Sequence, residues 1–184
     1  ILSGSAGTGK TFLAIYFALE QALKYDRQRV VIVRSAVSSR DMGFAPGTYA
    51  EKAKPYFDPY RPLVNNLFGR DDAWGVMIEK RKIETLTTSH LRGTTLDNCV
   101  VILDELQNCT FHEIDTVITR LGDECRLILC GDFAQDDLQM RREKSGFTNA
   151  VKILRAVPNV KEIVFTPADC VRSGFVRDYL IQKE

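Results

Sequence analysis

The stretch that decides the fold lies near the start of the chain and reads Gly4-Ser5-Ala6-Gly7-Thr8-Gly9-Lys10-Thr11. Its glycines let backbone N–H groups turn inward around phosphate oxygens, where side chains would collide with a ligand. Lys10 supplies a positive charge for the β- and γ-phosphates, and the Thr11 hydroxyl is placed to bind Mg²⁺. Because the following residues are typical of a helix, the phosphates would lie at its positive N-terminus. The stretch therefore predicts a binding loop for ATP or another nucleoside triphosphate.

The residues before this loop are too few for a complete strand. A phosphate-binding loop normally follows a buried strand, yet only Ile1 and Leu2 supply apolar side chains ahead of Gly4. We therefore expect a first strand that is truncated at the N-terminus, and one domain over residues 1–184. Residues upstream of such a loop often hold the base, so we do not expect these residues to determine base specificity.

Composition narrows the class of protein. With 184 residues and 45% hydrophobic content, the chain can bury one good core. Its net charge of +1 neither favours nor excludes a nucleic-acid partner, because a basic stripe can lie within a neutral total. No apolar run approaches a membrane span, and nothing resembles a signal peptide. Five cysteines without a Cys-x-x-Cys pair favour reduced thiols, so we expect a cytoplasmic protein with no membrane partner.

Apolar runs alternate with helical patterns along the rest of the chain. Short β-branched runs such as residues 30–33 and 100–103 are typical of strands buried on both faces of a parallel sheet. Strands that alternate with helices predict an α/β fold with a doubly wound, mostly parallel sheet, which binds ligands at the carboxyl ends of its strands. The expected strands are 30–33, 83–87, 100–103, 127–130 and 160–165, and the expected helices are 11–19, 63–80, 111–121, 146–156 and 174–182.

Two acidic residues directly follow the strand expected at 100–103. Asp104 is placed to hold Mg²⁺ through its water shell. Glu105 lies one residue further out and is predicted to act as general base on the attacking water. Alone, the pattern is also typical of acidic residues that cap a helix. Together with the loop at 4–11, it favours the catalytic interpretation.

A second polar turn, at residues 131–135, follows the strand expected at 127–130. In an open parallel sheet it would bring Asp132 and Gln135 near the γ-phosphate. The Gln135 amide can hydrogen-bond the attacking water or the phosphate and report hydrolysis to a neighbouring surface. The alternative is a turn in which Asp132 caps backbone amides. We predict a functional role for Gln135, and for Asp132 both interpretations stay open.

These stretches together resemble superfamily-1 helicases and, more closely, the PhoH-like family of phosphate-starvation ATPases. Residues 104–107 match the acidic box of the helicases, and residues 131–135 match the motif after it. The resemblance to PhoH-like proteins spans essentially the whole chain. Its collinear features are residues 4–11, 34–37, 43–47, 91–96, 103–108, 119–122, 131–138, 145–146 and 169–173. The chain departs at Leu106, Gln139 and Ser173, where the family usually has Ala, Pro and His.

That resemblance implies a P-loop NTPase fold of the RecA or helicase type, Mg²⁺-dependent ATP hydrolysis, and action on RNA or single-stranded DNA. PhoH-like proteins are also linked to hexamers, and some carry a nuclease domain. A chain with one nucleotide core would need a second subunit to complete a helicase-like site. We therefore expect a homo-oligomer, such as a hexameric ring.

Arginines outside the loop add further expectations. Arg172 matches the family's Val-Arg-His segment and follows the last expected strand, so it is predicted to reach a γ-phosphate, often that of another subunit. The alternative is an ion pair with Asp169 or Asp178. Arg34 and Arg92 either line a polynucleotide path or serve as solvated or capping side chains.

Aromatic and basic side chains mix in the segment at 49–61. Stacking on nucleic-acid bases over a basic surface would explain that mixture. Packing of aromatic rings against prolines, which stiffens a long loop, also explains it, and we favour this interpretation.

Three classes of function remain open. The first is a nucleic-acid-stimulated ATPase of the helicase-like kind, which Glu105 and Gln135 favour because both are suited to activating water. The second is a small-molecule phosphotransferase, for which we find no arginine-rich lid over a second phosphorylated substrate. The third is an ATP-dependent interaction module that drives a protein partner without nucleic acid.

Overall fold

The computed structural model describes residues 1–25, 28–35, 54–91, 93–132 and 147–183. Within these ranges six strands form a sheet in the order β3-β2-β4-β5-β1-β6, and every strand pair is parallel. The strands are β1 (Leu2–Gly4), β2 (Arg29–Arg34), β3 (Ile83–Thr87), β4 (Cys99–Leu103), β5 (Arg126–Gly131) and β6 (Ile163–Phe165). The helices are α1 (Lys10–Lys24), α3 (Tyr60–Phe68), α4 (Ala73–Glu79), α5 (Phe111–Ile118), α7 (Phe147–Arg155) and α8 (Gly174–Lys183), with 3₁₀ turns η2 (Thr88–Leu91), η3 (Leu106–Asn108) and η4 (Pro167–Asp169).

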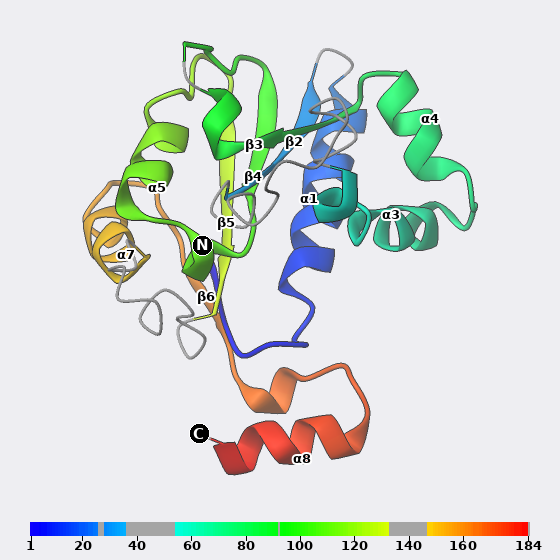
Figure 1. Ribbon diagram of the computed structural model, residues 1–184, viewed down its shortest axis with the longest axis vertical. Helices are drawn as coiled ribbons and strands as arrows, with labels where there is room; N and C mark the ends of the chain where they lie inside the picture. The colour runs from blue at the N-terminus through cyan, green and yellow to red at the C-terminus, as the bar shows by residue number, and fades with distance from the viewer. Residues whose placement is uncertain (26–27, 36–53, 92, 133–146, 184) are drawn as a thin grey trace, which may run out of the picture.

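Helices lie on both sides of the sheet (Figure 1), and each face of the sheet carries its own hydrophobic core. Val30 and Ile32 of β2 lie in the core under α1, α3 and α4, whereas Val31 and Val33 lie in the core under α5 and α7. All four side chains are fully buried, because successive residues of a strand point to opposite faces and helices cover both. The predicted doubly wound α/β fold with a parallel sheet is therefore confirmed.

Helix α1 covers the first core because small and apolar residues recur on one of its faces. Ala14, Ala18 and Ala22 let the helix lie close to the sheet, while Ile15 and Leu19 fill the remaining space. Full burial of a side chain the size of Ile15 contributes about 1.5–3 kcal/mol to the free energy of folding. This packing fixes the start of α1, and with it one end of the loop at 4–11.

The single helix expected at 63–80 is wrong. Gly69 ends α3 with a φ of 62°, and its N–H donates to the carbonyls of Asn65 and Asn66. Glycine adopts this left-handed conformation readily, so it ends helices more often than other residues do. A second helix, α4, begins at Ala73. The two helices form a hairpin in which α3 packs beside α1 and α4 packs against α3 (Figure 1).

The other elements lie where the sequence predicted them, with shifted ends. Helix α1 continues to Lys24, α5 ends at Ile118, and β6 begins only at Ile163. β3 is at the edge of the sheet, as predicted. β1 is three residues long and lies between β5 and β6.

A carboxylate at the carboxyl edge of the sheet joins three elements. Glu113 of α5 accepts hydrogen bonds from the hydroxyls of Ser35, after β2 (2.7 Å), and Thr88, in η2 (2.6 Å). It also accepts one from the backbone N–H of Thr110, the N-cap of α5 (2.9 Å). Burial raises the pKa of Glu113, but these hydrogen bonds outweigh burial and leave its pKa below the ordinary value. The ionised carboxylate therefore stabilises the fold.

We expect Glu113→Gln to lower the free energy of unfolding by about 1–3 kcal/mol at pH 7, the cost of leaving buried donors poorly paired. Because the folded pKa is below the unfolded one, the carboxylate stabilises the fold above about pH 4.3. That contribution is lost as the pH falls through the folded pKa, so the difference between variant and wild type should shrink below about pH 4. Urea unfolding at pH 7 and at about pH 3 measures it, and an equal difference at both would contradict the assignment.

Candidate nucleotide-binding site

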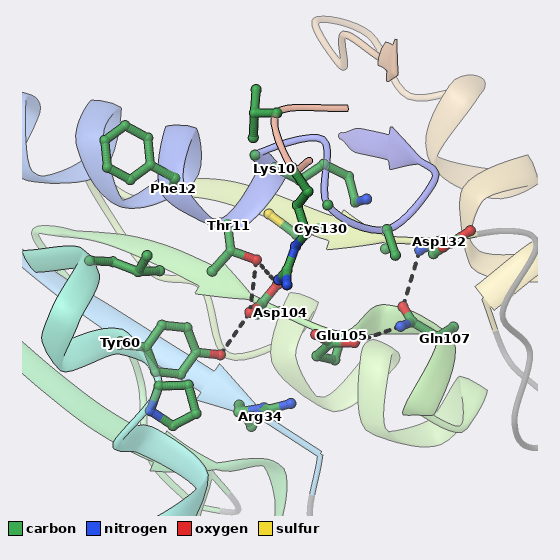
Figure 2. A pocket seen from close by; sticks show the side chains of 18 residues that line it. Lys10, Thr11, Phe12, Arg34, Tyr60, Asp104, Glu105, Gln107, Cys130 and Asp132 are labelled. Carbon is green, nitrogen blue, oxygen red and sulfur yellow. Dashed lines mark hydrogen bonds between the residues drawn. The ribbon is translucent and has the colours of Figure 1, made fainter. Parts of the chain in front are cut away.

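Polar residues at the carboxyl edge of the sheet surround a cavity of about 530 Å³. The loop before α1, the ends of β2, β4 and β5, the start of α3 and the segment after η4 form its walls. Lys10, Thr11, Asp104 and Glu105 all line it (Figure 2), and so does Arg172. Because the strands are parallel, residues far apart in the sequence meet here.

Two glycines of the loop are required for different reasons. Gly7 has a φ of 75°, a conformation that other residues rarely adopt. Gly4 lies against β6, and a Cβ at this position would collide with the backbone carbonyl of Phe165. The loop therefore depends on glycine both for its turn and for its contact with the sheet. Gly9 is the N-cap of α1.

The remaining loop residues form a compact turn under Lys10. The buried Thr8 hydroxyl donates to the carbonyl of Ser5 (2.9 Å), and Ala6 lines the cavity. Lys10 Nζ donates to the carbonyls of Gly4 (2.7 Å) and Ser5 (2.6 Å). These acceptors are neutral, so a bound phosphate would give the Lys10 ammonium an oppositely charged partner.

Asp104 and Thr11 meet as the sequence predicted. The Thr11 hydroxyl donates to the two carboxylate oxygens of Asp104, at 3.1 and 3.2 Å, and the Tyr60 hydroxyl donates to Oδ2 at 2.8 Å (Figure 2). Asp104 is only 4% exposed. Within the described ranges it forms no ion pair with a lysine or arginine. A buried carboxylate with neutral donors beside a threonine hydroxyl fits Mg²⁺, which Thr11 and Asp104 would hold.

Glu105 follows Asp104 with an unusual backbone. Its φ is 57° and its ψ is 49°, a left-handed conformation that costs a non-glycine residue of order 1–3 kcal/mol. Burial, followed by the nearby Asp104 charge, raises the pKa of the Glu105 carboxyl above its ordinary value. A raised pKa suits a carboxylate that takes a proton near neutral pH.

The role of Gln107 was not predicted from the sequence. Its Nε2 donates to Glu105 Oε2 (2.6 Å), and its Oε1 accepts from the backbone N–H of Asp132 (3.1 Å), as Figure 2 shows. This buried amide therefore links the end of β4 to the end of β5. The one feature of the sequence that could have indicated this role is the neutral amide of Gln107 within the acidic motif at 104–107. Tyr60 gave no signal, because it stood among several aromatic residues.

Only one of the two residues singled out after β5 lies within the described ranges. Asp132 is buried and lines the cavity. Burial lowers the pKa of Lys10, and the Asp132 charge is the largest influence that opposes this effect. Asp132 therefore helps to keep the lysine charged. Gln135 lies outside the described residues, and its role stays a prediction.

Arg172 lies over the loop of its own chain. The neighbouring Val171 N–H donates to the carbonyl of Gly7 (3.1 Å), and the Arg172 side chain would be about 3.2 Å from a Cβ placed on Gly7. Neither alternative ion pair forms, since Asp169 accepts from the backbone N–H of Thr166 and Asp178 pairs with Arg177. The structure thus places Arg172 at the cavity in cis.

Arg34 also lies at the cavity. It donates to the backbone carbonyl of Tyr56 (3.0 Å) and lies 5.9 Å from the centre of the Tyr60 ring. Phe57 and Tyr60 are 4% and 2% exposed, so these rings are packed in the core and do not offer faces to bases. Arg92 lies outside the described ranges.

No helix in the part of the chain that the structure describes has both the length and the apolar character needed to cross a bilayer.

Comparison with known proteins identifies relatives along the whole chain. A family model described as "PhoH-like protein" matches residues 1–182. The chain is 37% identical to a PhoH-like protein of Synechocystis sp. over 95% of this chain and 53% of that protein. It is 35% identical to a PhoH-like protein of Bacillus subtilis (94% and 54%) and 37% identical to Protein PhoH of Escherichia coli K12 (94% and 49%). The chain therefore spans about half the length of the curated relatives it matches.

The family match and the geometry agree. The loop at 4–11, the parallel sheet and the acidic end of β4 are those of a nucleotide-binding P-loop protein. The chain belongs to the PhoH-like family and is a P-loop ATPase-like protein.

Proposed function

We propose that the chain binds Mg²⁺·ATP in this cavity and hydrolyses it. The observation that carries the proposal is the contact of Thr11 with the buried Asp104, which shares one cavity with Lys10 and Glu105. Phosphate binding, metal binding and water activation need these residue types side by side.

Each residue has a distinct task in this proposal. Lys10 neutralises charge on the β- and γ-phosphates, and the N-terminus of α1 adds the partial charge of its free N–H groups. Thr11 and Asp104 hold Mg²⁺, which neutralises charge on the phosphate oxygens when it is bound. Glu105 accepts the proton of the attacking water, held in place by Gln107.

Release of labelled phosphate from γ-labelled ATP tests the proposal. The chain should release inorganic phosphate in the presence of Mg²⁺ and not in EDTA, and Asp104→Asn should abolish that difference. Label that appears on a small-molecule acceptor in place of water would favour a phosphotransferase. The absence of any Mg²⁺-dependent release would contradict hydrolysis.

RNA or single-stranded DNA is the partner that we propose for the hydrolysis cycle, in a cytoplasmic protein. The resemblance to superfamily-1 helicases supports a polynucleotide, and the five free cysteines support a reducing compartment. Hydrolysis should then rise when either polymer is added. An unchanged rate with both polymers would favour the interaction module, whose stimulant would be a protein.

We also propose that the chain assembles with copies of itself. Large apolar side chains are exposed after β6, with Val171 at 78%, Phe175 at 81% and Tyr179 at 60% exposure. Apolar surface of this kind is typical of protein contacts. Light scattering during size-exclusion chromatography would measure the assembly, and a monomer at all concentrations would contradict it.

Arg172→Ala should lower kcat about tenfold and change ATP affinity little. The Arg172 guanidinium would stabilise the charge that develops on the phosphate during hydrolysis, but the side chain is exposed, so solvent screens part of this interaction. Since Arg172 lies over its own loop, mixing this variant with Lys10→Ala subunits should not restore activity. Recovery of activity in the mixture would show instead that Arg172 acts on a neighbouring subunit.

A further inference from the structure

The Tyr60 hydroxyl is a buried polar group in an apolar setting. Tyr60 is 2% exposed and packs with Val64, Trp74 and residues of α1 in the first core. Its hydroxyl donates to Asp104 Oδ2 at 2.8 Å, on the carboxylate that Thr11 also contacts (Figure 2). A buried tyrosine hydroxyl usually finds a partner, but this partner is the residue assigned to the metal.

Packing, and not the phosphate-binding loop, fixes the position of Tyr60. Its ring lies 6.2 Å from the ring of Phe57, and the Arg34 guanidinium lies 5.9 Å from its centre. The α3–α4 hairpin behind it is tied by a hydrogen bond from the Trp74 N–H to Asn65 Oδ1 (2.9 Å). The hydroxyl is therefore preorganised, and its direction does not depend on a bound nucleotide.

Thr11 cannot orient Asp104 in the same independent way. It belongs to the loop that binds phosphate, and its oxygen is itself assigned to Mg²⁺. Tyr60 contacts one carboxylate oxygen and comes from a different element, α3. Of the two donors to Asp104 among the described residues, Tyr60 is the one that can hold the carboxylate without taking part in metal binding.

We infer that Tyr60 is a positioning residue for the metal: its hydroxyl holds the Asp104 carboxylate in the orientation that binds Mg²⁺. The inference rests on the proposed role of Asp104. Partners of metal ligands commonly change metal affinity 10–100-fold when they are removed. Tyr60 would thereby make Mg²⁺ affinity depend on the placement of the α3–α4 hairpin.

ADP affinity with and without Mg²⁺ tests this inference without measuring turnover. The dissociation constant of ADP is measured by calorimetry in Mg²⁺ and in EDTA, and the value in EDTA divided by the value in Mg²⁺ reports the contribution of the metal. Tyr60→Phe removes only the hydroxyl and should lower the ratio about tenfold, with ADP affinity in EDTA unchanged. Tyr16→Phe removes an exposed hydroxyl on α1 and should leave both values at wild type.

Asp104→Asn distinguishes an error in the proposed metal site from an error in the role of Tyr60. If wild type shows no Mg²⁺ effect, or Asp104→Asn retains it, the proposed metal site is wrong. If Asp104→Asn loses the effect and Tyr60→Phe keeps it within twofold, only the role of Tyr60 is overturned. Trp74, the single tryptophan of the chain, packs in the same core and reports the fold by its emission. Altered emission together with lost ADP binding in EDTA would show that Tyr60 acts through the fold, which also overturns the inference.

Discussion

Glu105→Gln is expected to slow ATP hydrolysis by about a hundredfold or more, the scale of a lost general base, while ATP stays bound. The amide has nearly the shape of the carboxylate and can still accept from Gln107, so the cavity keeps its form. What it loses is the ability to take a proton from water. Single-turnover hydrolysis and ATP affinity, measured together, separate the two effects.

The control for this substitution is Glu20→Gln, which makes the same change on the exposed side of α1. It should hydrolyse ATP at the wild-type rate. Near-normal turnover in Glu105→Gln would remove Glu105 from the role of base.

The pH dependence should follow from the same residue. Burial and the Asp104 charge raise the pKa of Glu105, and a general base works only when it is deprotonated. The rate should therefore fall on the acid side at a pH above about 4.3, the ordinary value for glutamate. In Glu105→Gln that acid limb should disappear.

Lys10→Ala is expected to abolish measurable ATP binding. Lys10 Nζ donates to two backbone carbonyls of the loop and, at 3.4 Å, to the Thr8 hydroxyl. In the complex it would direct at least two hydrogen bonds to phosphate oxygens. Hydrogen bonds to charged groups contribute about 1.5–3 kcal/mol each, so losing two weakens binding roughly 10²–10⁴-fold.

Thermal stabilisation by ATP checks the Lys10 prediction, because a ligand that binds only the folded state raises the melting temperature. Lys24→Ala changes a lysine in the last turn of α1 and should melt and bind like wild type. Normal stabilisation of Lys10→Ala by ATP would refute phosphate binding by this side chain.

Much of the fold could be predicted because its central strands β2 and β4 are buried on both faces. Such strands read as continuous β-branched runs, as β2 and β4 do, and they leave little doubt about a parallel sheet. The break at Gly69 was missed because the apolar spacing continues across it, while the conformation of one glycine separates α3 from α4. The periodicity of apolar residues is judged over many positions, so it does not detect a change of backbone conformation at one residue.

The sequence could predict which residues lie together at the candidate site where chain position alone fixes the geometry. Thr11 opens a helix after one strand and Asp104 ends another, so a parallel sheet brings them together. Gln107 and Tyr60 could not be assigned, because their partners are set by side-chain direction within the folded chain. The position of Arg172 over its own loop likewise depends on the course of the chain after β6.

The place of β1 between β5 and β6 determines when the site can form. β1 is first in the sequence, yet Leu2 pairs with Cys130 of β5 and with Ile163 of β6. Closing such long loops is slow, because their entropy is lost before the strand contacts form. On the ribosome, residues 4–11 would therefore be synthesised long before β5 and β6, the strands that pair with β1. ATP would then stabilise only chains that have been synthesised through β6, and could not assist the earlier steps of folding.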